Sequence, residues 1–335
     1  MYLRENENMP SVVSDVYHLK AVMPFIGHMQ LSDIHNGTLQ EFVKARKATM
    51  RRVKISKTEV TERPLKNKTV NLSLALVGKI LNLATDWREE NNTPWLVSAP
   101  RIKLLSKSDS RPPRPIHWPE QRRLIPLLPK HLAQMALFCL NTGVRDEVVC
   151  NLRWEWELSL SQIGGNSVFI VPKQYVKGQK KYIGDRVLVC NDVAQSVIEA
   201  MRGKHATHVF VYRRERVKRS DLEPIMPYRP VQTMNNIAWQ NARLGAKLGD
   251  LHVHDLRHTV AMRLREAKCD ERTIQDVLWH SCITVTDLYS SAQVVEIFNA
   301  LQKIRDESGR QNISIRSLLL EENEKRLTRK SLSTA

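Results

Sequence analysis

Apolar side chains recur at the three- and four-residue spacing of amphipathic helices in separate stretches of the chain. From Thr69 to Trp87, the apolar positions on one face are Val70, Leu74, Val77, Leu81 and Ala84. A shorter helix is predicted from Thr38 to about Arg46, because Thr38 and Glu41 have the spacing of a capping box. These patterns predict that the first hundred residues form a small helical domain.

The second half of the chain combines helical spacing with short β-branched runs. Helices are predicted up to Gly143, over His254–Glu266 and over Asp270–Trp279. The runs Val168–Val171 and Val187–Val189 flank a polar stretch rich in Lys and Gly, which predicts a hairpin with a basic tip. This half is therefore expected to be mostly helical with a small sheet.

Residues 101–116, RIKLLSKSDSRPPRPI, contain three prolines and no hydrophobic period, which is typical of an extended linker. The expected organisation is a helical domain over 1–100, this linker, a second domain over 117–305 and a charged tail over 306–335. The basic positions in the linker are Arg101, Lys103, Lys107, Arg111 and Arg114. A second basic stretch, Arg51–Lys68, has two interpretations, a solvated loop or a DNA contact.

The composition indicates a polyanionic partner. The 335 residues carry 52 Lys and Arg against 35 Asp and Glu, so the formal net charge is +17 and the sequence pI is near 9.8. Nucleic acid is favoured over an anionic membrane, because the chain has no basic amphipathic helix with an aromatic apolar face. No apolar run reaches the roughly 18 residues that span a bilayer, and the five cysteines form no disulfide or zinc pattern. We expect a cytoplasmic protein.

The segment His252–His258, HVHDLRH, concentrates candidate chemistry. On a helix, His254 and Arg257 would lie one turn apart and face the same anion. Zinc is the alternative ligand, but the pair His254 and His258 lacks the intervening Glu and the third ligand of such sites. Phosphate is therefore favoured, and no metal is expected.

The longer stretch from His254 to Ser290, HDLRHTVAMRLREAKCDERTIQDVLWHSCITVTDLYS, resembles the C-terminal signature of the tyrosine recombinase (phage integrase) family. That signature comprises an H-x-x-R box, a helix, a histidine and a tyrosine nine positions later. Upstream, NTGVRDEVVCNLRW resembles the first arginine box of the family, and VPKQYVKG resembles its lysine-bearing β-hairpin. The matching positions are Arg145, Lys177, His254, Arg257, His280 and Tyr289.

The resemblance implies a mainly α fold with a small β-sheet, in which a helical core-binding (SAM-like) domain precedes a mixed α+β catalytic domain. It implies a site-specific DNA recombinase that integrates or excises a mobile element such as a phage or prophage. The implied partners are double-stranded DNA with a specific recombination site, further copies of the chain in a homotetramer on two DNA sites, and a DNA-bending accessory protein. No cofactor or metal is implied, and the location would be the cytoplasm, on the nucleoid.

The resemblance also implies a role for each matching residue. Tyr289 would be the nucleophile, forming a 3′-phosphotyrosyl bond and leaving a free 5′-hydroxyl. Arg145 and Arg257 would stabilise the negative charge on the phosphate oxygens. The general acid, the acceptor of the phenolic proton and the hydrogen-bond donor to the phosphate would be Lys177, His254 and His280.

Further expectations concern DNA binding and assembly. The segment VVEIFNALQKI, residues 294–304, carries Val294, Ile297 and Leu301 at helical spacing and is expected to dock on a neighbouring subunit as the family implies. The additional amino-terminal domain by which many phage integrases bind arm-type DNA sites is expected to be absent. The residues expected to contact DNA are Arg101, Lys103, Lys107, Arg111, Arg114, Arg213 and Arg214.

Two positions depart from the family pattern. Trp279 stands directly before His280, where the family usually has Gly, so the turn there is expected to differ. Val148 stands where an acidic residue commonly braces the first arginine, and Glu147 lies one place early.

Two other function classes remain open from the sequence. A type IB topoisomerase-like enzyme would share the nucleophile and the arginines but would act as a monomer with little sequence preference. A non-catalytic DNA-binding derivative would keep the basic surface and lose cleavage. Plasmid relaxation without paired sites identifies the first class, and the lack of a covalent protein–DNA adduct identifies the second.

Overall fold

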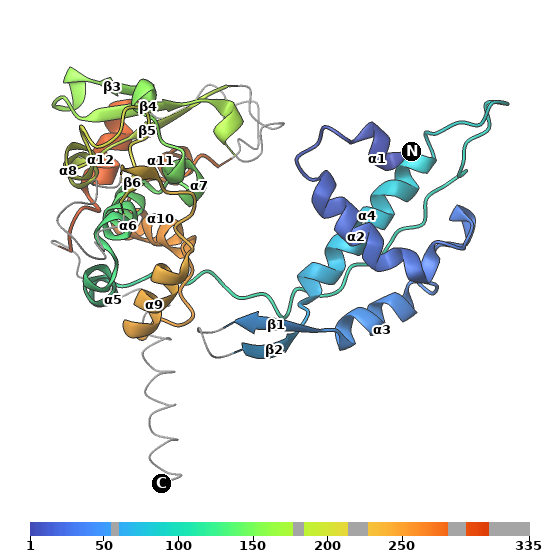
Figure 1. Cartoon of the computed structure of the whole chain (residues 1–335). Coiled ribbons are helices and arrows are strands. Elements are labelled where there is room, and N and C mark those ends of the chain that lie inside the picture. The colour runs from blue at the N-terminus through green and yellow to red at the C-terminus, as the bar shows by residue number, and fades with distance from the viewer. Residues whose placement is uncertain (55–59, 177–183, 214–226, 281–292, 308–335) are drawn as a thin grey trace, which may run out of the picture. The chain divides into compact units, whose positions relative to one another are not determined.

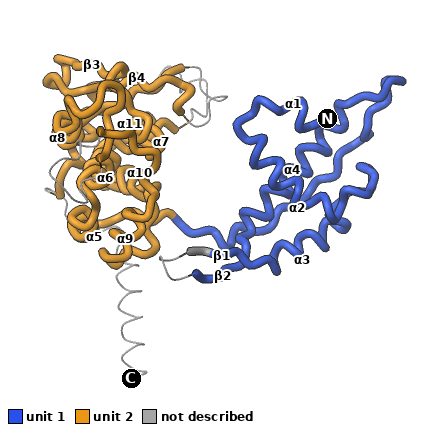
Figure 2. Tube along the Cα trace, in the orientation of Figure 1, with its two compact units in different colours: residues 1–112 blue, residues 113–335 orange. Residues whose placement is uncertain are grey.

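A computed structural model of the chain divides into two compact units, Met1–Pro112 and Pro113–Ala335 (Figure 2). The structure describes residues 1–54, 60–176, 184–213, 227–280 and 293–307. Each unit has its own hydrophobic core, as expected for a domain. The two units are therefore described separately.

The first unit is a small helical body with one added hairpin (Figure 1). Helices α2 and α4 pack against each other and against α3. Their buried faces include Val22, Phe42 and the predicted positions of α4 from Val70 to Ala84. Its elements are α1 (Tyr2–Glu5), α2 (Val12–Ile26), η1 (Leu31–Asp33), α3 (Gln40–Ala48), β1 (Met50–Lys54), β2 (Val60–Pro64) and α4 (Asn67–Ala84).

The predicted helix after Thr38 is confirmed, but its predicted capping box is wrong. Helix α3 begins at Gln40, and no side chain caps it. The hydroxyl of Thr38 instead accepts a hydrogen bond from the backbone N–H of His35 at 3.0 Å, within the preceding turn. Local side-chain bonds of this kind compete with capping.

The basic stretch after α3 contains two paired strands, so the first of its two interpretations, a solvated loop, does not hold for these residues. Strands β1 and β2 are antiparallel, with Met50 opposite Pro64 and Lys54 opposite Val60. The strands are too rich in charged residues to show the alternation that identifies a half-buried strand.

Asparagine side chains hold the first part of the predicted linker against the first unit. Asn36 donates to the carbonyl of Arg101 at 2.9 Å and accepts from the N–H of Lys103 at 2.7 Å. Asn71 makes the same pair of bonds with the backbone of Leu105. The division between the units falls after Pro112, near the end of this segment.

The second unit is built around helix α6, whose last residues, from Phe138 to Thr142, are all buried. Helices α8 and α10 both pack on α6. Its helices are α5 (Trp118–Leu124), α6 (Lys130–Thr142), α7 (Asp146–Cys150), α8 (Asp192–Glu199), α9 (Ile237–Gly245), α10 (Asp255–Glu266), α11 (Glu271–Val277) and α12 (Val294–Gln302). Its strands and 3-10 helices are β3 (Glu157–Ser159), β4 (Ser167–Val171), β5 (Arg186–Val189), β6 (Val211–Tyr212), β7 (Arg229–Pro230), η2 (Ile125–Leu127), η3 (Trp154–Trp156), η4 (Ser161–Ile163) and η5 (Lys173–Tyr175).

The antiparallel sheet β3-β4-β5 separates two hydrophobic clusters of this unit. The pair Phe169 and Leu188 belongs to the larger cluster around α6. The neighbouring pair, Val168 and Val189, belongs to the smaller cluster with α10, α11 and α12. Successive residues of a strand face opposite sides, so the predicted pairing of these two runs is confirmed and each face contributes side chains to one cluster. The predicted basic tip between them lies mostly outside the described residues.

Helix α6 ends, as predicted, at Gly143, whose φ of +70° favours glycine. The same glycine permits a close approach of three segments. A Cβ at this position would lie 2.9 Å from Leu278 Cδ2 and 3.1 Å from Val260 Cγ1. The turn after α6 is therefore fitted tightly against α10 and the end of α11.

The apolar face of α12 is buried within its own chain. Ile297 is 8% exposed and Leu301 is fully buried, in the cluster shared with α10 and α11. The buried side chain of Asn191 donates to the carbonyl of Leu301 at 2.9 Å and to the side chain of Asn141 at 3.0 Å. The prediction that this face docks on a neighbouring subunit gains no support from the single chain, which covers the face itself.

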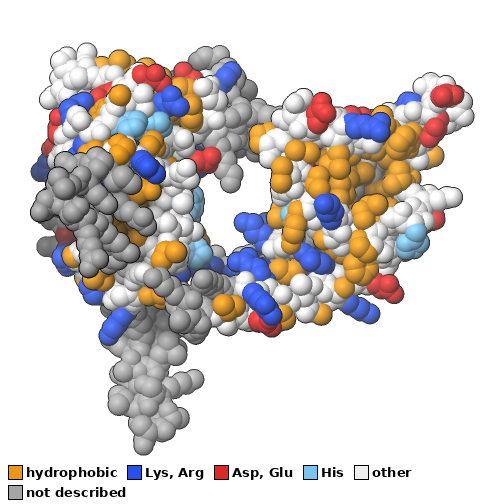
Figure 3. Space-filling model, in the orientation of Figure 1, with side chains coloured by type: hydrophobic (Ala, Val, Ile, Leu, Met, Phe, Trp, Pro, Cys, Tyr) orange, Lys and Arg blue, Asp and Glu red, His pale blue; other side chains and the backbone are white. Residues whose placement is uncertain are grey.

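Side chains at the surface are mixed in character (Figure 3). On the first unit, exposed apolar side chains gather along α2, where Val13, Tyr17 and Met23 are 78%, 57% and 49% exposed. Among the described residues, no helix has the length and apolar character needed to cross a membrane.

The contribution of the close packing at Gly143 can be measured as a change in the free energy of unfolding. We expect Gly143→Ala to destabilise the second unit by about 2–4 kcal/mol, because the new methyl group adds overpacking to left-handed strain. Gly164→Ala is the matched control, since Gly164 has a φ of +71° with no atom near the added Cβ. It should cost about 1–2 kcal/mol. Denaturant unfolding monitors both variants, and equal losses would contradict the packing argument.

Candidate active site

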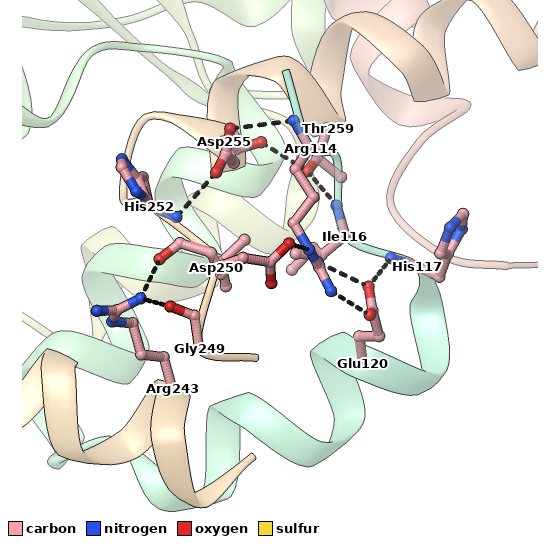
Figure 4. Close-up of polar contacts among 11 residues, drawn as sticks. Arg114, Ile116, His117, Glu120, Arg243, Gly249, Asp250, His252, Asp255 and Thr259 are labelled. Carbon is pink, nitrogen blue, oxygen red and sulfur yellow. Dashed lines mark hydrogen bonds and ion pairs between the residues drawn. The ribbon is translucent and has the colours of Figure 1, made fainter. Parts of the chain in front are cut away.

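The start of helix α10 is held by a polar network that includes the last part of the predicted linker (Figure 4). The buried carboxylate of Asp255 accepts from the N–H of His252 at 2.8 Å and from that of Arg114 at 3.2 Å. Two residues further along the chain, the N–H of Ile116 donates to the hydroxyl of Thr259 at 3.0 Å. These bonds fix the helix that carries His254 and Arg257.

The guanidinium of Arg114 belongs to the same network and is engaged by carboxylates. It forms a bidentate pair with Glu120, at 2.7 and 3.2 Å, and donates to Asp250 at 2.7 Å. Its side chain is only 17% exposed. The prediction of a DNA contact at Arg114 is therefore not supported by its surroundings.

Arg257 joins helix α10 to the turn after α6. Its side chain is 4% exposed, and Nη1 donates to the carbonyl oxygen of Gly143 at 2.8 Å. His254 lies one turn before it, at the start of α10. The i,i+3 spacing seen in the sequence thus places both side chains at the same cavity.

Arg145 lies two residues after Gly143 and precedes the first turn of α7. Its side chain is half-buried, and its Nη1 is buried with no hydrogen-bond partner within the described ranges. A buried guanidinium N–H that lacks an acceptor is unfavourable unless a ligand supplies one. This geometry suits an anion that enters the cavity.

His280 follows the end of α11. The backbone N–H of His280 donates to the carbonyl oxygen of Gln275 at 2.9 Å. The backbone N–H of Trp279 donates to the carbonyl oxygen of Asp276 at 3.1 Å. This pair of bonds closes the helix in a Schellman turn. The turn brings His280 to the cavity that holds the two arginines.

Four of the six predicted catalytic positions line one cavity of about 440 Å³. They reach it from three separate segments, the turn after α6, the start of α10 and the end of α11. The four are Arg145, His254, Arg257 and His280. The other two predicted positions, Lys177 and Tyr289, lie outside the described residues.

The cavity disfavours protonated histidine. Burial lowers the pKa of His254, as do the positive charges of His258, Arg257 and Arg145, whereas Asp146 acts in the opposite direction. Burial likewise lowers the pKa of His280, together with Arg257, Arg145 and His258. Both imidazoles are therefore mostly neutral at pH 7, and the permanent positive charge in the cavity comes from the arginines.

Three polar residues that line this cavity were not among the predicted site residues, Asp146, Glu147 and His258. The two acids follow Arg145 directly, and His258 lies one turn after His254, so each had a local signal. The ring centroids of His254 and His258 are 4.9 Å apart, in an edge-to-face arrangement. Val148, at the family's acidic position, is buried in the core, so the acids at this wall are those one and two places earlier.

The remaining predicted DNA contacts are surface residues. The side chains of Arg101, Lys103, Lys107 and Arg111 are exposed in the first unit, and that of Arg213 is exposed in the second. Arg213 also lies over the ring of Tyr228, at 5.0 Å from its centroid. Arg214 lies outside the described residues.

No group of three or more His, Cys, Asp or Glu side chains in the described part of the chain is arranged to hold a metal ion. The donors of the cavity are mainly guanidinium and imidazole groups, and guanidinium does not ligate metals. The site therefore suits an anion better than a cation.

Comparison with known sequences agrees with this geometry. The profile of the phage integrase family matches residues 122–295, just over half of the chain. The integrase of Salmonella phage P22 is 29% identical over 192 residues, which cover 56% of this chain and 46% of that protein. A tyrosine recombinase of Pseudothermotoga lettingae is 26% identical over 221 residues, which cover 62% and 70% of the two chains. The chain thus spans less than half the length of the P22 relative.

Comparison with solved structures shows the same fold. The integrase of transposon Tn1549, in complex with transposon right end DNA, superposes with a TM-score of 0.55 at 14% identity, covering 91% of this chain and 98% of that one. The site-specific recombinase XerH, bound to its palindromic difH substrate, gives a TM-score of 0.54 at 13% identity, with 83% and 75% covered. With the profile match, these similarities show that the chain belongs to the phage integrase family of tyrosine recombinases.

Proposed function

We propose that this protein is a site-specific DNA recombinase that cuts and rejoins DNA strands through a 3′-phosphotyrosyl bond to Tyr289. The observation that carries the proposal is the convergence of Arg145, His254, Arg257 and His280 on one cavity. Arg145 lies more than a hundred residues before the other three, so their meeting is a property of the fold. The family relationship supports the same activity.

The arginines suit a phosphate in its transition state. Attack on phosphorus places additional negative charge on the two non-bridging oxygens, and preorganised donors that cannot lose their protons stabilise that charge. Arg257 is held in place by Gly143. Arg145 carries a buried N–H that still lacks an acceptor among the described residues. Both groups are therefore in place before the DNA binds.

The proton transfers are assigned to three other residues. The phenol of Tyr289 loses its proton to His254 as its oxygen forms the bond to phosphorus, and a neutral imidazole is the form that can accept that proton. The bond to the 5′ oxygen then breaks, and Lys177 donates a proton to give the free 5′-hydroxyl. Ligation reverses these steps with a 5′-hydroxyl from the other strand. His280 donates a hydrogen bond to the phosphate throughout.

The proposed partner is double-stranded DNA carrying a specific recombination site, on which four copies of the chain join two such sites. Pairing of sites is what distinguishes recombination from the relaxing activity of a topoisomerase. A DNA-bending accessory protein, a mobile element such as a phage or prophage as the substrate, and a cytoplasmic location on the nucleoid complete the proposal.

The proposal predicts a covalent adduct that depends on Tyr289. We expect the protein to become attached to nicked suicide duplexes drawn from a pool with a randomised core sequence, because the released strand end diffuses away before ligation. Denaturing gel electrophoresis detects the adduct, and sequencing of the attached DNA identifies the site. Tyr289→Phe should form none, since it lacks the nucleophilic oxygen.

The outcomes of this experiment separate the function classes. Attachment to many unrelated sequences, with relaxation of plasmids that lack paired sites, indicates a topoisomerase-like enzyme. A wild-type protein that binds DNA without attachment is a non-catalytic derivative. Attachment by Tyr289→Phe at the wild-type level would show that another residue is the nucleophile.

The neutral state of His254 predicts a pH dependence. The pKa of His254 lies below the ordinary value of 6.5. An NMR titration of the free protein should therefore show His254 gaining its proton at a lower pH than an ordinary histidine does. Asp146→Asn removes the charge that opposes this shift, so the pKa of His254 and the acid limb of the cleavage rate should both move to lower pH. Glu147→Gln is the matched control, because the side chain of Glu147 is exposed and solvent screens its charge. Equal shifts in the two variants would contradict a specific role of Asp146.

The β1–β2 hairpin offers a second test of DNA binding, in the first unit. Arg51 and Arg63 are directly opposite in the register, and both are exposed. Like charges in that position repel each other unless an anion lies between them. On the other face, Arg52 is opposite Glu62 and pairs with it at 3.4 Å. The face with Arg51 and Arg63 is thus suited to a phosphate. On the face with Arg52, the carboxylate of Glu62 offsets the positive charge.

We expect Arg51→Ala and Arg63→Ala each to weaken binding to a random-sequence duplex. Affinity falls as salt rises, and each substitution should make the plot of log affinity against log salt less steep by about 0.9, the contribution of one phosphate contact. Arg52→Ala removes the same charge from the same strand and should change the slope much less. Fluorescence anisotropy over a salt series measures all three. An equal effect of Arg52→Ala would show that net charge, and not the Arg51 face, determines binding.

A further inference from the structure

The turn before His280 contains a residue in an unfavourable backbone conformation. Trp279 has a φ of +50°, in the left-handed region. In the described part of the chain, the other non-glycine residues with positive φ are Asn92, Lys247 and Lys268. A bulky aromatic residue is rare in this region, and such a conformation persists only where its surroundings hold it.

The hydrogen bonds of the turn explain why a left-handed residue is required. Trp279 occupies the position of a Schellman turn at which the chain reverses and which usually holds glycine. The bonds from Trp279 to Asp276 and from His280 to Gln275 both depend on that reversal. If Trp279 relaxed to a right-handed conformation, the chain would leave the helix in another direction and His280 would leave the cavity.

The side chain of Trp279 supplies the contacts that hold the turn. The residue is 4% exposed and belongs to the hydrophobic cluster around α6, which also contains Val176 and Leu188. Its indole N–H donates to the carbonyl oxygen of Val187 at 2.8 Å. Val187 lies on β5, which pairs only with β4 among the described strands, so its outer carbonyl would otherwise lack a partner in the sheet.

We infer that Trp279 is a positioning residue that fixes His280 at the phosphate site by anchoring its turn to the edge of strand β5. The inference rests on the proposed function for its consequence in catalysis. A glycine would adopt the turn without strain but would provide no anchor. This chain therefore combines in one residue the turn that brings His280 to the cavity and its attachment to the sheet.

The first test follows His280 in the free protein. The pKa of His280 is lowered by burial and by Arg257, Arg145 and His258. In Trp279→Gly the turn loses its anchor, so His280 should spend time away from these groups, and its pKa should rise toward the ordinary value in an NMR titration. Because this measurement uses no DNA, it remains decisive even if the protein forms no covalent adduct.

The second test measures cleavage of the suicide substrate in a double-mutant cycle. We expect Trp279→Gly to slow cleavage roughly tenfold or more, because small displacements of a positioned group carry large rate costs. In a His280→Ala background the same change should cost nothing further, since the loss acts through His280. A merely structural role would give the same loss in both backgrounds.

Two further variants complete the experiment. Trp279→Phe keeps a buried ring and removes the N–H, so it should shift the titration and the rate in the same directions even if Trp279→Gly does not fold. Lys268→Gly is the matched control. Lys268 has a φ of +55° in the same type of turn at the end of α10, and its side chain is exposed. Lys268→Gly should leave the titration of His280 and the cleavage rate unchanged. Wild-type titration and rate in folded Trp279→Gly or Trp279→Phe would overturn the inference.

Discussion

The site depends on the close fit of the turn at Gly143. The carbonyl of this glycine accepts a hydrogen bond from Arg257, and its missing side chain leaves room for Val260 of α10 and Leu278 at the end of α11. Arg145 lies two residues after Gly143, and His280 lies two residues after Leu278. One contact point therefore sets the positions of the three segments that line the cavity. Because interiors are close-packed, a shift at this point would move all three segments together.

The cavity combines side chains of permanent charge with side chains that can gain or lose a proton. Arginines keep their charge at any physiological pH, and in this cavity they also hold the pKa values of His254 and His280 below the ordinary range, in addition to the effect of burial. The imidazoles are therefore available as neutral hydrogen-bonding and proton-accepting groups beside a strongly positive site. The arrangement of charge that suits an anion is therefore the same one that lowers the pKa values of the two imidazoles beside it.

Local signals in the sequence were sufficient for the parts of the site that are local. Gly143 marked the end of α6, and the spacing of His254 and Arg257 placed both on one face of α10. The hairpin β1–β2 was missed because charged strands carry no hydrophobic alternation. The apolar face of α12 was assigned to a neighbouring subunit because periodicity shows that a face will be buried, and not by what. A different turn was expected at Trp279, because a tryptophan normally disfavours positive φ, but the residue adopts the left-handed conformation that suits a glycine.

The net charge of +17 is likewise no measure of the DNA-binding surface. Arg114 pairs with Glu120 and Asp250, Arg202 pairs with Glu157 and Glu199, and Arg263 lies over the ring of Trp118 at 3.5 Å. These cations stabilise the second unit, and two of their partners are more than a hundred residues distant in sequence. Arg114 was one of the linker residues predicted to contact DNA, but its guanidinium is engaged by two carboxylates and its backbone N–H bonds to Asp255 at the start of α10. Only the fold distinguishes cations that hold the protein together from those that remain for a phosphate, because the distinction depends on which carboxylates and rings each one meets.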